Sequence, residues 1–518
     1  MSDKINNIVI VGGGSAGWLT AGVLAAEYAA KGDDAINICL VESDSVAPIG
    51  VGEGTWPSMR TTLEKMGISE TELVLECDAS FKQGSQFNNW LTGHNEHYFH
   101  PFTLPVGSQE MDLAPYWQNF SDKVSFANAV CPQGHLSAKH LAPKQISTAE
   151  YSFAANYGYH LDAAKLGLFL QKHCIHKLGV THIVDHVTHI NSQANGDIAS
   201  LTTAQHGDIS GDLFIDCSGS KSLLLGQHYK VPFIECQETL FNDSALAVHV
   251  PYADENSPIN SFTHSTAQTA GWIWDIGLPS RRGVGHTYCA AYISDELAEQ
   301  QLRAYISQTA NQTVADSLHV RKISFQPGYR AKFWQNNCVA IGLSAGFIEP
   351  LEASALALIE LSAKMLSEQL PSTRQNMEIV AKRFNQKFTQ RWQHIIDFLK
   401  LHYVLSKRSD SAYWLDNRDK QTIPDSLQEL LAFWQYQPPS HYDNPHTEAL
   451  FPAASFQYVL YGMGFASNVN LARKRHNKMT QAECLFNENM QRSKQLLTGL
   501  PSNRELLNKI KQYGLPKI

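Results

Sequence analysis

The sequence has no apolar run close to the length of a membrane span. A helix needs roughly 20 consecutive apolar residues to cross a bilayer, and no stretch of the 518 residues approaches that length. Residues 1–30 have no substantial basic region, and glycines interrupt their apolar stretch, which argues against a signal peptide. We therefore expect a cytoplasmic protein without a membrane partner.

Cysteine patterns typical of disulfide frameworks and metal sites are also absent. The nine cysteines are scattered from Cys39 to Cys484 without a C-x-x-C pair, as expected for buried free thiols in a reducing compartment. His94, His97 and His100 recur at every third position. Their segment has the composition of a loop, and no complete set of metal ligands accompanies the three histidines. We therefore predict no metal site.

The charge pattern gives no sign of a nucleic-acid partner. The formal net charge is −8 and there is no long basic tract, whereas surfaces that bind nucleic acid are basic. Internal repeats, low-complexity tracts and long linkers are absent as well. A chain of this length allows roughly two to four domain-sized units with a substantial core.

A glycine-rich turn between a strand and a helix is the strongest motif present. Residues 8–11 have the pattern of a short buried strand, and Gly12-Gly13-Gly14-Ser15-Ala16-Gly17 follows at once. Residues 18–30 are apolar and rich in alanine, which favours a helix. This is the G-x-G-x-x-G pattern in the context that makes it a dinucleotide-binding motif. The alternative is a glycine-rich turn that binds no ligand.

Each residue of this turn has a physical role in holding a dinucleotide. Gly12 permits the tight turn, Gly14 lets a pyrophosphate approach the backbone, and Gly17 lets the strand and helix pack closely. Ser15 and Ala16 begin the helix, where free N–H groups and the helix dipole attract phosphates. We predict all five as cofactor-binding residues.

Later segments distinguish FAD from NAD. A second strand over residues 36–41 ends at Glu42, whose carboxylate can accept hydrogen bonds from a ribose. Residues 212–219 form a strand pattern ending in small residues, and residues 338–346 form another that leads toward a helix. Returning units of this kind commonly grip large cofactors, so together they favour FAD. The alternative is that both are merely core strands of an α/β domain.

The remaining pattern predicts an α/β fold, with an FAD-binding doubly wound (Rossmann-like) core, an inserted and largely antiparallel sheet, and a helical C-terminal substrate region. We place the discontinuous core with its insert in residues 1–365 and a substrate-covering helical region in residues 366–518. The segments behind this prediction are 1–80, 160–225 and 320–365 for the core, 230–330 for the sheet, and 353–369, 380–405 and 483–513 for helices.

The chain resembles the flavin-dependent tryptophan halogenase family over most of its length. The matching segments occur in the family's order. They are the glycine turn, residues 49–57 (the loop that straps the flavin), Phe81-Lys82 (the lysine segment), residues 98–102 (a segment that sandwiches the substrate ring), residues 272–276 (the W-x-W-x-I-P signature) and residues 347–352 (the glutamate segment).

The resemblance implies a two-component halogenase. Reduced FAD, O₂ and a halide, either chloride or bromide, would yield hypohalous acid, which a protein-lined path would carry to an indole-like aromatic substrate. The reduced flavin would come from a separate NAD(P)H-dependent flavin reductase, since the chain has no second nucleotide motif. A homodimer is possible, and the sequence does not determine the oligomeric state. The rival readings are a flavin-dependent aromatic monooxygenase and a flavoprotein without catalytic activity.

Two residues would carry the chemistry by this resemblance. Lys82 would hold the oxidised halogen, a role that suits a buried lysine because desolvation lowers its pKa. An ordinary surface lysine or a member of an ordinary ion pair is the alternative. Glu352 would stabilise the cationic ring intermediate and accept its proton. Glu349 is a nearby competitor. Glu352 can also be explained as a cap of the helix that we expect to begin near Ala353.

The start of that helix is also the expected halide site. Backbone N–H groups of Ser354 and Ala355 can bind a small anion. The family's E-S-T-G has become residues 352–355, E-A-S-A, in this chain. Loss of the glycine restricts the backbone at Ala355, so we expect an altered halide geometry.

The flavin and substrate pockets are assigned by resemblance too. Val51, Val187, Leu343 and Leu356 would line the flavin. His100 and Phe102 would sandwich the substrate ring, and Phe456 or Tyr458 would stack on it. Residues 451–464 lack the tyrosine pair with which family members grip free tryptophan. We therefore expect an indole, another electron-rich arene or a larger tryptophan-bearing molecule.

The two tryptophans of the signature are harder to assign. Trp272 and Trp274 would share one face of a strand and wall one side of a cavity. In the family this wall keeps the substrate away from the flavin. Two core tryptophans are the alternative. The signature also departs from the family because Gly277 stands where proline is expected.

Overall fold

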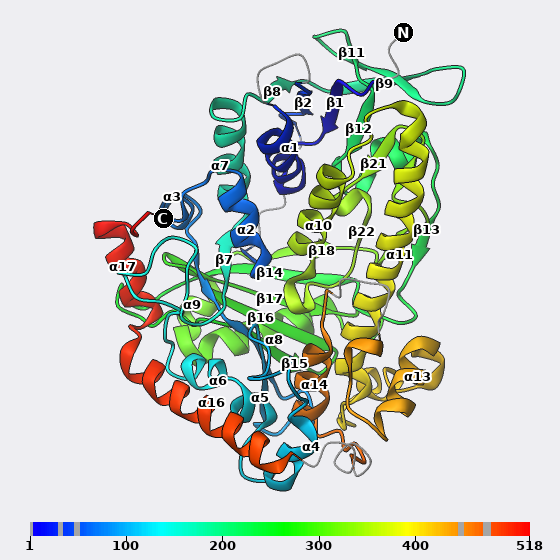
Figure 1. Cartoon of the computed structure of the whole chain (residues 1–518). Helices are drawn as coiled ribbons and strands as arrows, with labels where there is room; N and C mark the ends of the chain where they lie inside the picture. Colours follow the sequence, from blue (N-terminus) through cyan, green and yellow to red (C-terminus); the bar gives the residue numbers. More distant parts are fainter. Residues whose placement is uncertain (1–3, 30–34, 46–51, 444–449, 470–477, 518) are drawn as a thin grey trace. The chain divides into compact units, whose positions relative to one another are not determined.

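The computed structural model describes residues 4–29, 35–45, 52–443, 450–469 and 478–517 (Figure 1). The chain forms two compact units. The antiparallel strands of residues 244–324 fall in unit 2 together with the C-terminal helices. Unit 1 comprises Met1–Asp78, Leu161–Cys236 and Gln326–Trp392, and unit 2 comprises Ala79–His160, Gln237–Phe325 and Gln393–Ile518.

A six-stranded sheet forms the centre of unit 1. Its strands are parallel except for the antiparallel edge strand β20. Ile8, Ile10, Leu213 and Ile215 have no exposed surface, as expected for strands of a parallel sheet that is covered on both faces. The order is β20 (Trp334–Gln335), β21 (Cys338–Ala340), β12 (Leu213–Asp216), β1 (Asn7–Val11), β2 (Asn37–Glu42) and β8 (Thr181–Val184).

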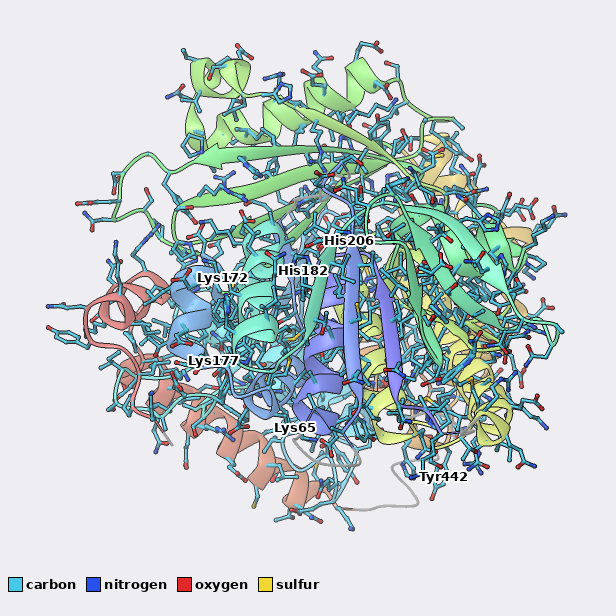
Figure 2. The ribbon with its side chains drawn as sticks, turned by 90° about the horizontal axis from the view of Figure 1, so that it is seen from above. Lys65, Lys172, Lys177, His182, His206 and Tyr442 are labelled. Carbon is cyan, nitrogen blue, oxygen red and sulfur yellow. The ribbon has the colours of Figure 1, made fainter. Side chains whose placement is uncertain are left out.

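Helices of unit 1 contact one another along this sheet. Helix α1 (Ser15–Tyr28) contacts both α7 (Ala163–His176) and α10 (Ser354–Glu368). Asp162 caps α7 by accepting from the N–H groups of Ala164 and Lys165. Figure 2 labels Lys177, the C-cap residue of α7, and Lys65 in the last turn of α2 (Ser58–Lys65). Cations near the C-terminus of a helix interact favourably with the helix dipole and stabilise the helix.

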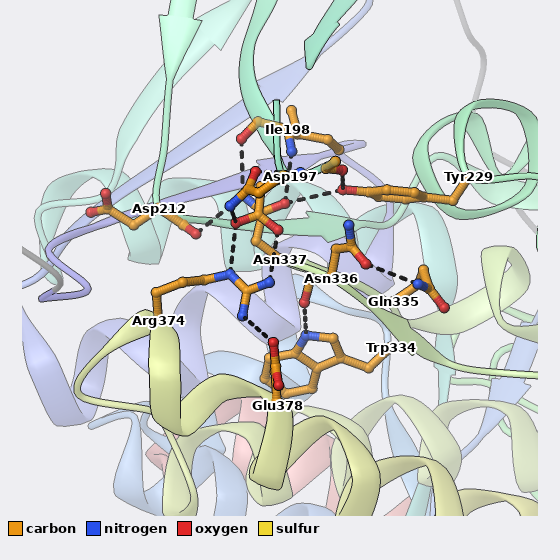
Figure 3. Close-up of polar contacts among 12 residues, drawn as sticks. Asp197, Ile198, Asp212, Tyr229, Trp334, Gln335, Asn336, Asn337, Arg374 and Glu378 are labelled. Carbon is orange, nitrogen blue, oxygen red and sulfur yellow. Dashed lines mark hydrogen bonds and ion pairs between the residues drawn. The ribbon is translucent and has the colours of Figure 1, made fainter. Parts of the chain in front are cut away.

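A polar network joins an outer hairpin of unit 1 to the central sheet (Figure 3). Asn337 receives a hydrogen bond from the Ile198 N–H (2.9 Å) and donates one to the Ile198 carbonyl (2.9 Å). Arg374, the first residue of α11 (Arg374–Val404), donates to both carboxylate oxygens of Asp197 at 2.6 and 2.9 Å. These bonds tie the hairpin of β9 (Val187–Ser192) and β10 (Ile198–Thr203) to the edge of the central sheet.

Unit 2 is built on a seven-stranded sheet that is antiparallel except for one parallel pair, β15 with β5. The antiparallel sheet expected between residues 230 and 330 is thus confirmed, with two strands added from earlier in the chain. The order is β18 (Arg321–Ser324), β14 (Ser244–Pro251), β17 (Arg281–Tyr288), β16 (Gly271–Gly277), β15 (Thr263–Gln268), β5 (Gly84–Asn88) and β6 (His97–Pro101).

Two local expectations, on the histidine segment and on residues 483–513, were wrong. The histidine segment is not all loop, because His97–Pro101 is the edge strand β6, paired with β5. Residues 338–346 lead toward helix α10, as expected, through a 3₁₀ turn and the short strand β22 (Gly346–Phe347). The helical pattern of residues 483–513 is broken into α16 (Met479–Gly499) and α17 (Asn503–Tyr513), because Leu500 is extended and Ser502 caps a new helix.

Candidate active site

Two glycines of the turn are required by close backbone contacts. A Cβ on Gly12 (φ +114°) would lie 2.2 Å from the Cys217 carbonyl oxygen, at the end of β12. A Cβ on Gly17 would lie 1.8 Å from the Gly12 carbonyl oxygen. Neither approach leaves room for a side chain, so the turn can wrap tightly around the start of α1.

Gly14 differs, because a Cβ there would meet nothing within 4 Å. It is the N-cap residue of α1, and Ser15, Ala16 and Gly17 are the first helical residues. Their N–H groups have no partner within the helix by geometry. Open space beside Gly14 and a helix N-terminus is what a pyrophosphate requires, so the turn fits the phosphates of FAD.

The carboxylate of Glu42 lies beside the glycine turn. Its Oε1 accepts from Gln171 Nε2 (2.8 Å) and lies 2.7 Å from His182 Nε2. Its Oε2 would be 1.5 Å from a Cβ on Gly13. His182, labelled in Figure 2, makes an edge contact with the Trp18 ring (5.1 Å between centroids). Glu42 is thus held next to the turn and keeps acceptor sites for a ribose hydroxyl.

The other predicted flavin-lining residues lie in different places. Leu343 is half-buried in the turn Gly342–Ser344, and a Cβ on Gly342 would be 2.7 Å from the Ala16 Cβ, so this turn packs on the glycine motif. Leu356 is buried in the first turn of α10. Val187 begins β9 and packs on a core cluster. Val51 lies outside the described residues.

The backbone around Glu352 is unusual. Glu352 (φ 64°, ψ 9°) and Ala353 (φ 56°, ψ 45°) are consecutive left-handed residues, and neither is glycine. Non-glycine residues seldom adopt this conformation, and such strain clusters at functional sites. The N-cap of α10 is Ala353. The explanation of Glu352 as the residue that caps this helix is therefore wrong.

The predicted halide donors are the first residues of α10. Ser354 is buried and Ala355 is half-buried. Several described non-glycine residues have left-handed backbone, and they include Glu352 and Ala353 but not Ala355. Ala355 is helical, so alanine is accommodated there without strain, and the altered halide geometry stays a prediction. The helix N-terminus can still present N–H groups to an anion.

Lys82 is buried, with 1% of its surface exposed. It ends β4 (Ser80–Lys82), and its Nζ lies 5.3 Å from the centroid of the Phe102 ring. A surface lysine is thereby excluded. Burial of an ammonium group is costly unless it is paired, and the Phe102 ring offsets part of that cost through a cation–π contact.

A buried histidine shares the face of Lys82. Strand β4 pairs with β7 so that His160 stands opposite Ser80 and Gly158 opposite Lys82. His160 and Lys82 therefore project from the same side of the ladder. His160 has no exposed surface, and its Nε2 lies 2.8 Å from Thr263 Oγ1. Burial, Lys82 and His264 hold the pKa of His160 well below its usual value.

The two signature tryptophans lie on one buried face of β16. Trp272 and Trp274 are 1% and 9% exposed, and their ring centroids are 6.3 Å apart. Trp272 also packs on Trp90 (6.4 Å). Gly277, at the end of this strand, accepts a hydrogen bond from Ser80 Oγ through its carbonyl. The signature strand is therefore bonded to the strand that carries Lys82.

An aromatic cluster surrounds the predicted substrate residues of unit 2. His100 Nε2 lies 2.9 Å from Ser455 Oγ, and the His100 and Tyr458 rings are 6.0 Å apart. Phe456 turns to another side of α14 (Ala453–Gly462) and packs on His394 (5.2 Å). The structure thus brings Tyr458, and not Phe456, to His100, while Phe102 is brought to Lys82.

The sequence did not predict the contacts that Phe398 and Trp56 make with residues of the candidate site. Phe398 stacks on Phe451 (3.8 Å) and lies 5.7 Å from His100. Trp56 donates its indole N–H to the Glu352 carbonyl (2.9 Å). Phe451 lay within the segment already singled out. Phe398 stands on a long helix without a motif, so no signal marked it.

The described part of the chain contains no candidate metal cluster and no candidate membrane-spanning helix. It contains no group of three or more His, Cys, Asp or Glu side chains arranged to hold a metal. None of its helices is long and apolar enough to cross a membrane.

Comparison with known proteins defines the class. A crystal structure of a tryptophan halogenase from Shewanella frigidimarina NCIMB 400 is 55% identical, covers 99% of both chains and gives a TM-score of 0.97. Tar14, a tryptophan C-6 flavin-dependent halogenase from taromycin biosynthesis, is 32% identical, covers 98% of this chain and 100% of its own, and gives 0.90. The tryptophan 6-halogenase SttH from Streptomyces toxytricini is 34% identical over 89% of each chain.

The chain is therefore a flavin-dependent halogenase, an enzyme class that uses flavin, halide and O₂. A family model described as tryptophan halogenase matches residues 7–478, and the chain belongs to this family. The α/β fold and the enzyme class expected from the sequence are confirmed. The hydroxylase and non-catalytic alternatives are not favoured.

Proposed function

We propose that this enzyme halogenates an indole-like aromatic with hypohalous acid, using reduced FAD delivered by a separate NAD(P)H-dependent flavin reductase. The observation that carries the proposal is the burial of Lys82 beside Phe102, with 1% of the lysine surface exposed. A buried amine can retain a reactive electrophile, and Phe102, the ring proposed to stack on the substrate, would place the arene beside it.

Unit 1 supplies the cofactor-binding residues. The turn with Gly12, Gly14 and Gly17 and the N-terminus of α1 hold the pyrophosphate, and Glu42 accepts from the ribose. When bound and reduced, FAD supplies the electrons with which O₂ converts halide to hypohalous acid. Leu343 lies in the turn that packs on the glycine motif, and Leu356 lies in the first turn of α10, a helix that contacts α1, which supports their assignment to the flavin pocket.

Lys82 holds the hypohalous acid, by a hydrogen bond or as a haloamine. His160 is the neighbouring ring on the same face, and its low pKa keeps it uncharged, so it adds no like charge beside the ammonium. The buried environment excludes water, which would otherwise let the oxidant diffuse away.

Glu352 stabilises the ring cation and accepts the proton that leaves as the carbon–halogen bond forms. The oxygen of the hypohalous acid departs as water, which balances the substitution. The N–H groups of Ser354 and Ala355 hold the halide, chloride or bromide, at the start of α10. The strained backbone at Glu352 supports a functional role for this segment.

The substrate proposed is an indole or a larger tryptophan-bearing molecule. His100, Phe102 and Tyr458 form its stacking surface. Relatives are named for action on tryptophan, but residues 451–464 of this chain contain no tyrosine pair to grip a free amino acid. We also propose that the enzyme is cytoplasmic, because all nine cysteines are free thiols, and that it acts alone or as a homodimer.

A product assay tests the proposal. Purified enzyme, a flavin reductase, NADH, FAD and air are combined with indole, tryptophan or a tryptophan-containing peptide, and with chloride or bromide. Mass spectrometry should show halogenated product, with Glu352→Gln retaining FAD but losing most turnover. Hydroxylated product without halogen would favour a monooxygenase. Equal turnover by Glu352→Gln would contradict the role of that carboxylate.

A further inference from the structure

The left-handed backbone of the two residues before α10 must be stabilised by contacts with its surroundings. Glu352 and Ala353 have φ values of 64° and 56°. An L-residue with a Cβ leaves this region for ordinary helical or extended backbone unless its surroundings select it. The position of the Glu352 side chain depends on these angles, because a change in them redirects the Cα–Cβ bond.

Trp56 supplies a contact at this point. Its indole N–H donates to the Glu352 carbonyl at 2.9 Å. The ring is half-buried, and Trp56 comes just before α2. A carbonyl oxygen held by a fixed donor cannot rotate freely, so this bond acts directly on the peptide between Glu352 and Ala353.

The segment that carries Trp56 is itself fixed to α10 at a second point. Ser58 Oγ and Thr62 Oγ1 donate to the two carboxylate oxygens of Glu360, at 2.9 and 2.6 Å. Glu360 is 2% exposed, and burial raises its pKa. Residues 56–62 are thus bonded to α10 both before its first turn and in its second.

We propose that Trp56 is a positioning residue for Glu352. Its indole N–H selects the left-handed backbone at residues 352–353 and so sets the direction of the Glu352 carboxylate. Trp56 belongs to the segment that resembles the flavin strap, and this bond links that segment directly to the carboxylate. The inference rests on the catalytic role proposed for Glu352.

The first test removes the indole N–H, together with one ring of the bicyclic side chain. Trp56→Phe keeps an aromatic ring but no donor. We expect kcat for halogenation to fall by at least about tenfold, since displacement of a reacting group by 1 Å costs up to about a hundredfold. KM for the arene and the affinity for FAD should stay unchanged. A kcat equal to that of the unchanged enzyme would overturn the proposal.

Trp334→Phe is the matched control. Trp334 Nε1 also donates to a backbone carbonyl in unit 1, that of Asn336, at 3.0 Å (Figure 3). Its loss should lower the melting temperature, as loss of the Trp56 bond should, without changing kcat. If both variants lower kcat equally, the effect is general destabilisation and the proposal fails.

The second test uses Ala353→Gly. Glycine adopts left-handed backbone at no steric cost, so it lessens the need for the Trp56 bond. The proportional loss of kcat caused by Trp56→Phe should therefore be smaller in the Ala353→Gly background. Effects that simply multiply would contradict selection of the backbone by Trp56.

A readout without activity separates this inference from the proposed function. The same double-mutant cycle is followed by thermal unfolding of the protein without added FAD, where coupling between Trp56 and Ala353 should again appear. If Glu352→Gln turns over normally but this coupling is present, the catalytic role fails and the backbone contact stands. If Glu352→Gln is inactive and coupling is absent, the positioning role alone fails.

Discussion

Lys82 and Phe102 lie together in unit 2, with the lysine Nζ 5.3 Å from the centroid of the phenylalanine ring. One ends β4 and the other follows β6 directly. A predicted catalytic residue and a predicted substrate-binding residue are therefore neighbours in space. Any arene that stacks on Phe102 comes within reach of an electrophile held by Lys82.

Replacing Lys82 by methionine should abolish halogenation while leaving the oxidation of reduced flavin by O₂ in place. We expect a loss of about 10²–10⁴-fold in kcat, typical for removal of a group that acts directly in the reaction. Product formation and NADH consumption are measured together. Lys144→Met is the control, because Lys144 is equally buried and lies 5.2 Å from the Tyr157 ring. Retained halogenation in Lys82→Met would contradict the assignment.

Alanine substitutions in the glycine turn should separate folding from cofactor binding. Gly17→Ala brings a Cβ to 1.8 Å from the Gly12 carbonyl oxygen, so the unfolding free energy should fall by about 1–3 kcal/mol or more. Gly14→Ala meets nothing within 4 Å, so stability without FAD should be unchanged. Its methyl group enters the space for the pyrophosphate, and FAD affinity should fall about tenfold or more, as judged by flavin fluorescence.

The opposite pattern would show that the pyrophosphate lies elsewhere. If Gly14→Ala binds FAD as tightly as the unchanged protein, the open space beside residue 14 is not the phosphate site. If Gly17→Ala melts normally, the helix can shift away from the turn.

Local pattern was enough to predict the centre of unit 1 but not the whole sheet of unit 2. The strand–turn–helix motif at residues 8–30 predicts β1 and α1 because each forms from neighbouring residues. The pairing of β15 with β5 joins residues about 180 positions apart in parallel. Strand periodicity shows which face is buried, but it does not identify the partner strand.

The candidate active site, like the sheet of unit 2, could be predicted from the sequence only in part. Lys82 and Glu352 stand in segments that resemble family motifs, so their positions in the sequence were enough to single them out. The bond from Trp56 to Glu352 spans 296 positions and ends on a backbone oxygen. A backbone acceptor leaves no trace in residue type, and the left-handed angles at Glu352 are unexpected for a glutamate.

The pH dependence of stability should change in Asp397→Asn. Burial raises the pKa of Asp397 from 3.8 to about 7, against a weaker opposing effect of the hydrogen bond with Ser426. The folded state therefore favours the neutral carboxyl. As pH rises from about 4 to about 7, the unfolded chain releases this proton more readily, so the contribution to folding stability is lost over that window.

Melting temperatures measured at several pH values test this contribution of Asp397 to the pH dependence of stability. Asparagine cannot ionise, so Asp397→Asn should gain stability relative to the unchanged protein between pH about 4 and about 7, with no further gain above. The exposed Asp122 provides a control, Asp122→Asn, which should show no such trend. A constant difference between Asp397→Asn and the unchanged protein at all pH values would contradict a raised pKa.

Ser455→Ala should weaken substrate binding without slowing the chemical step. The Ser455 hydroxyl lies 2.9 Å from His100 Nε2 and fixes the orientation of the imidazole ring, which has Phe398 as a neighbour at 5.7 Å. A net hydrogen bond is worth about 0.5–1.5 kcal/mol, so KM for the arene should rise by up to about tenfold with kcat unchanged. Ser493→Ala is the control, because that hydroxyl donates to the Asn489 carbonyl of its own helix. A fall in kcat at constant KM would instead make His100 part of the chemistry, since its orientation would then matter only in the transition state.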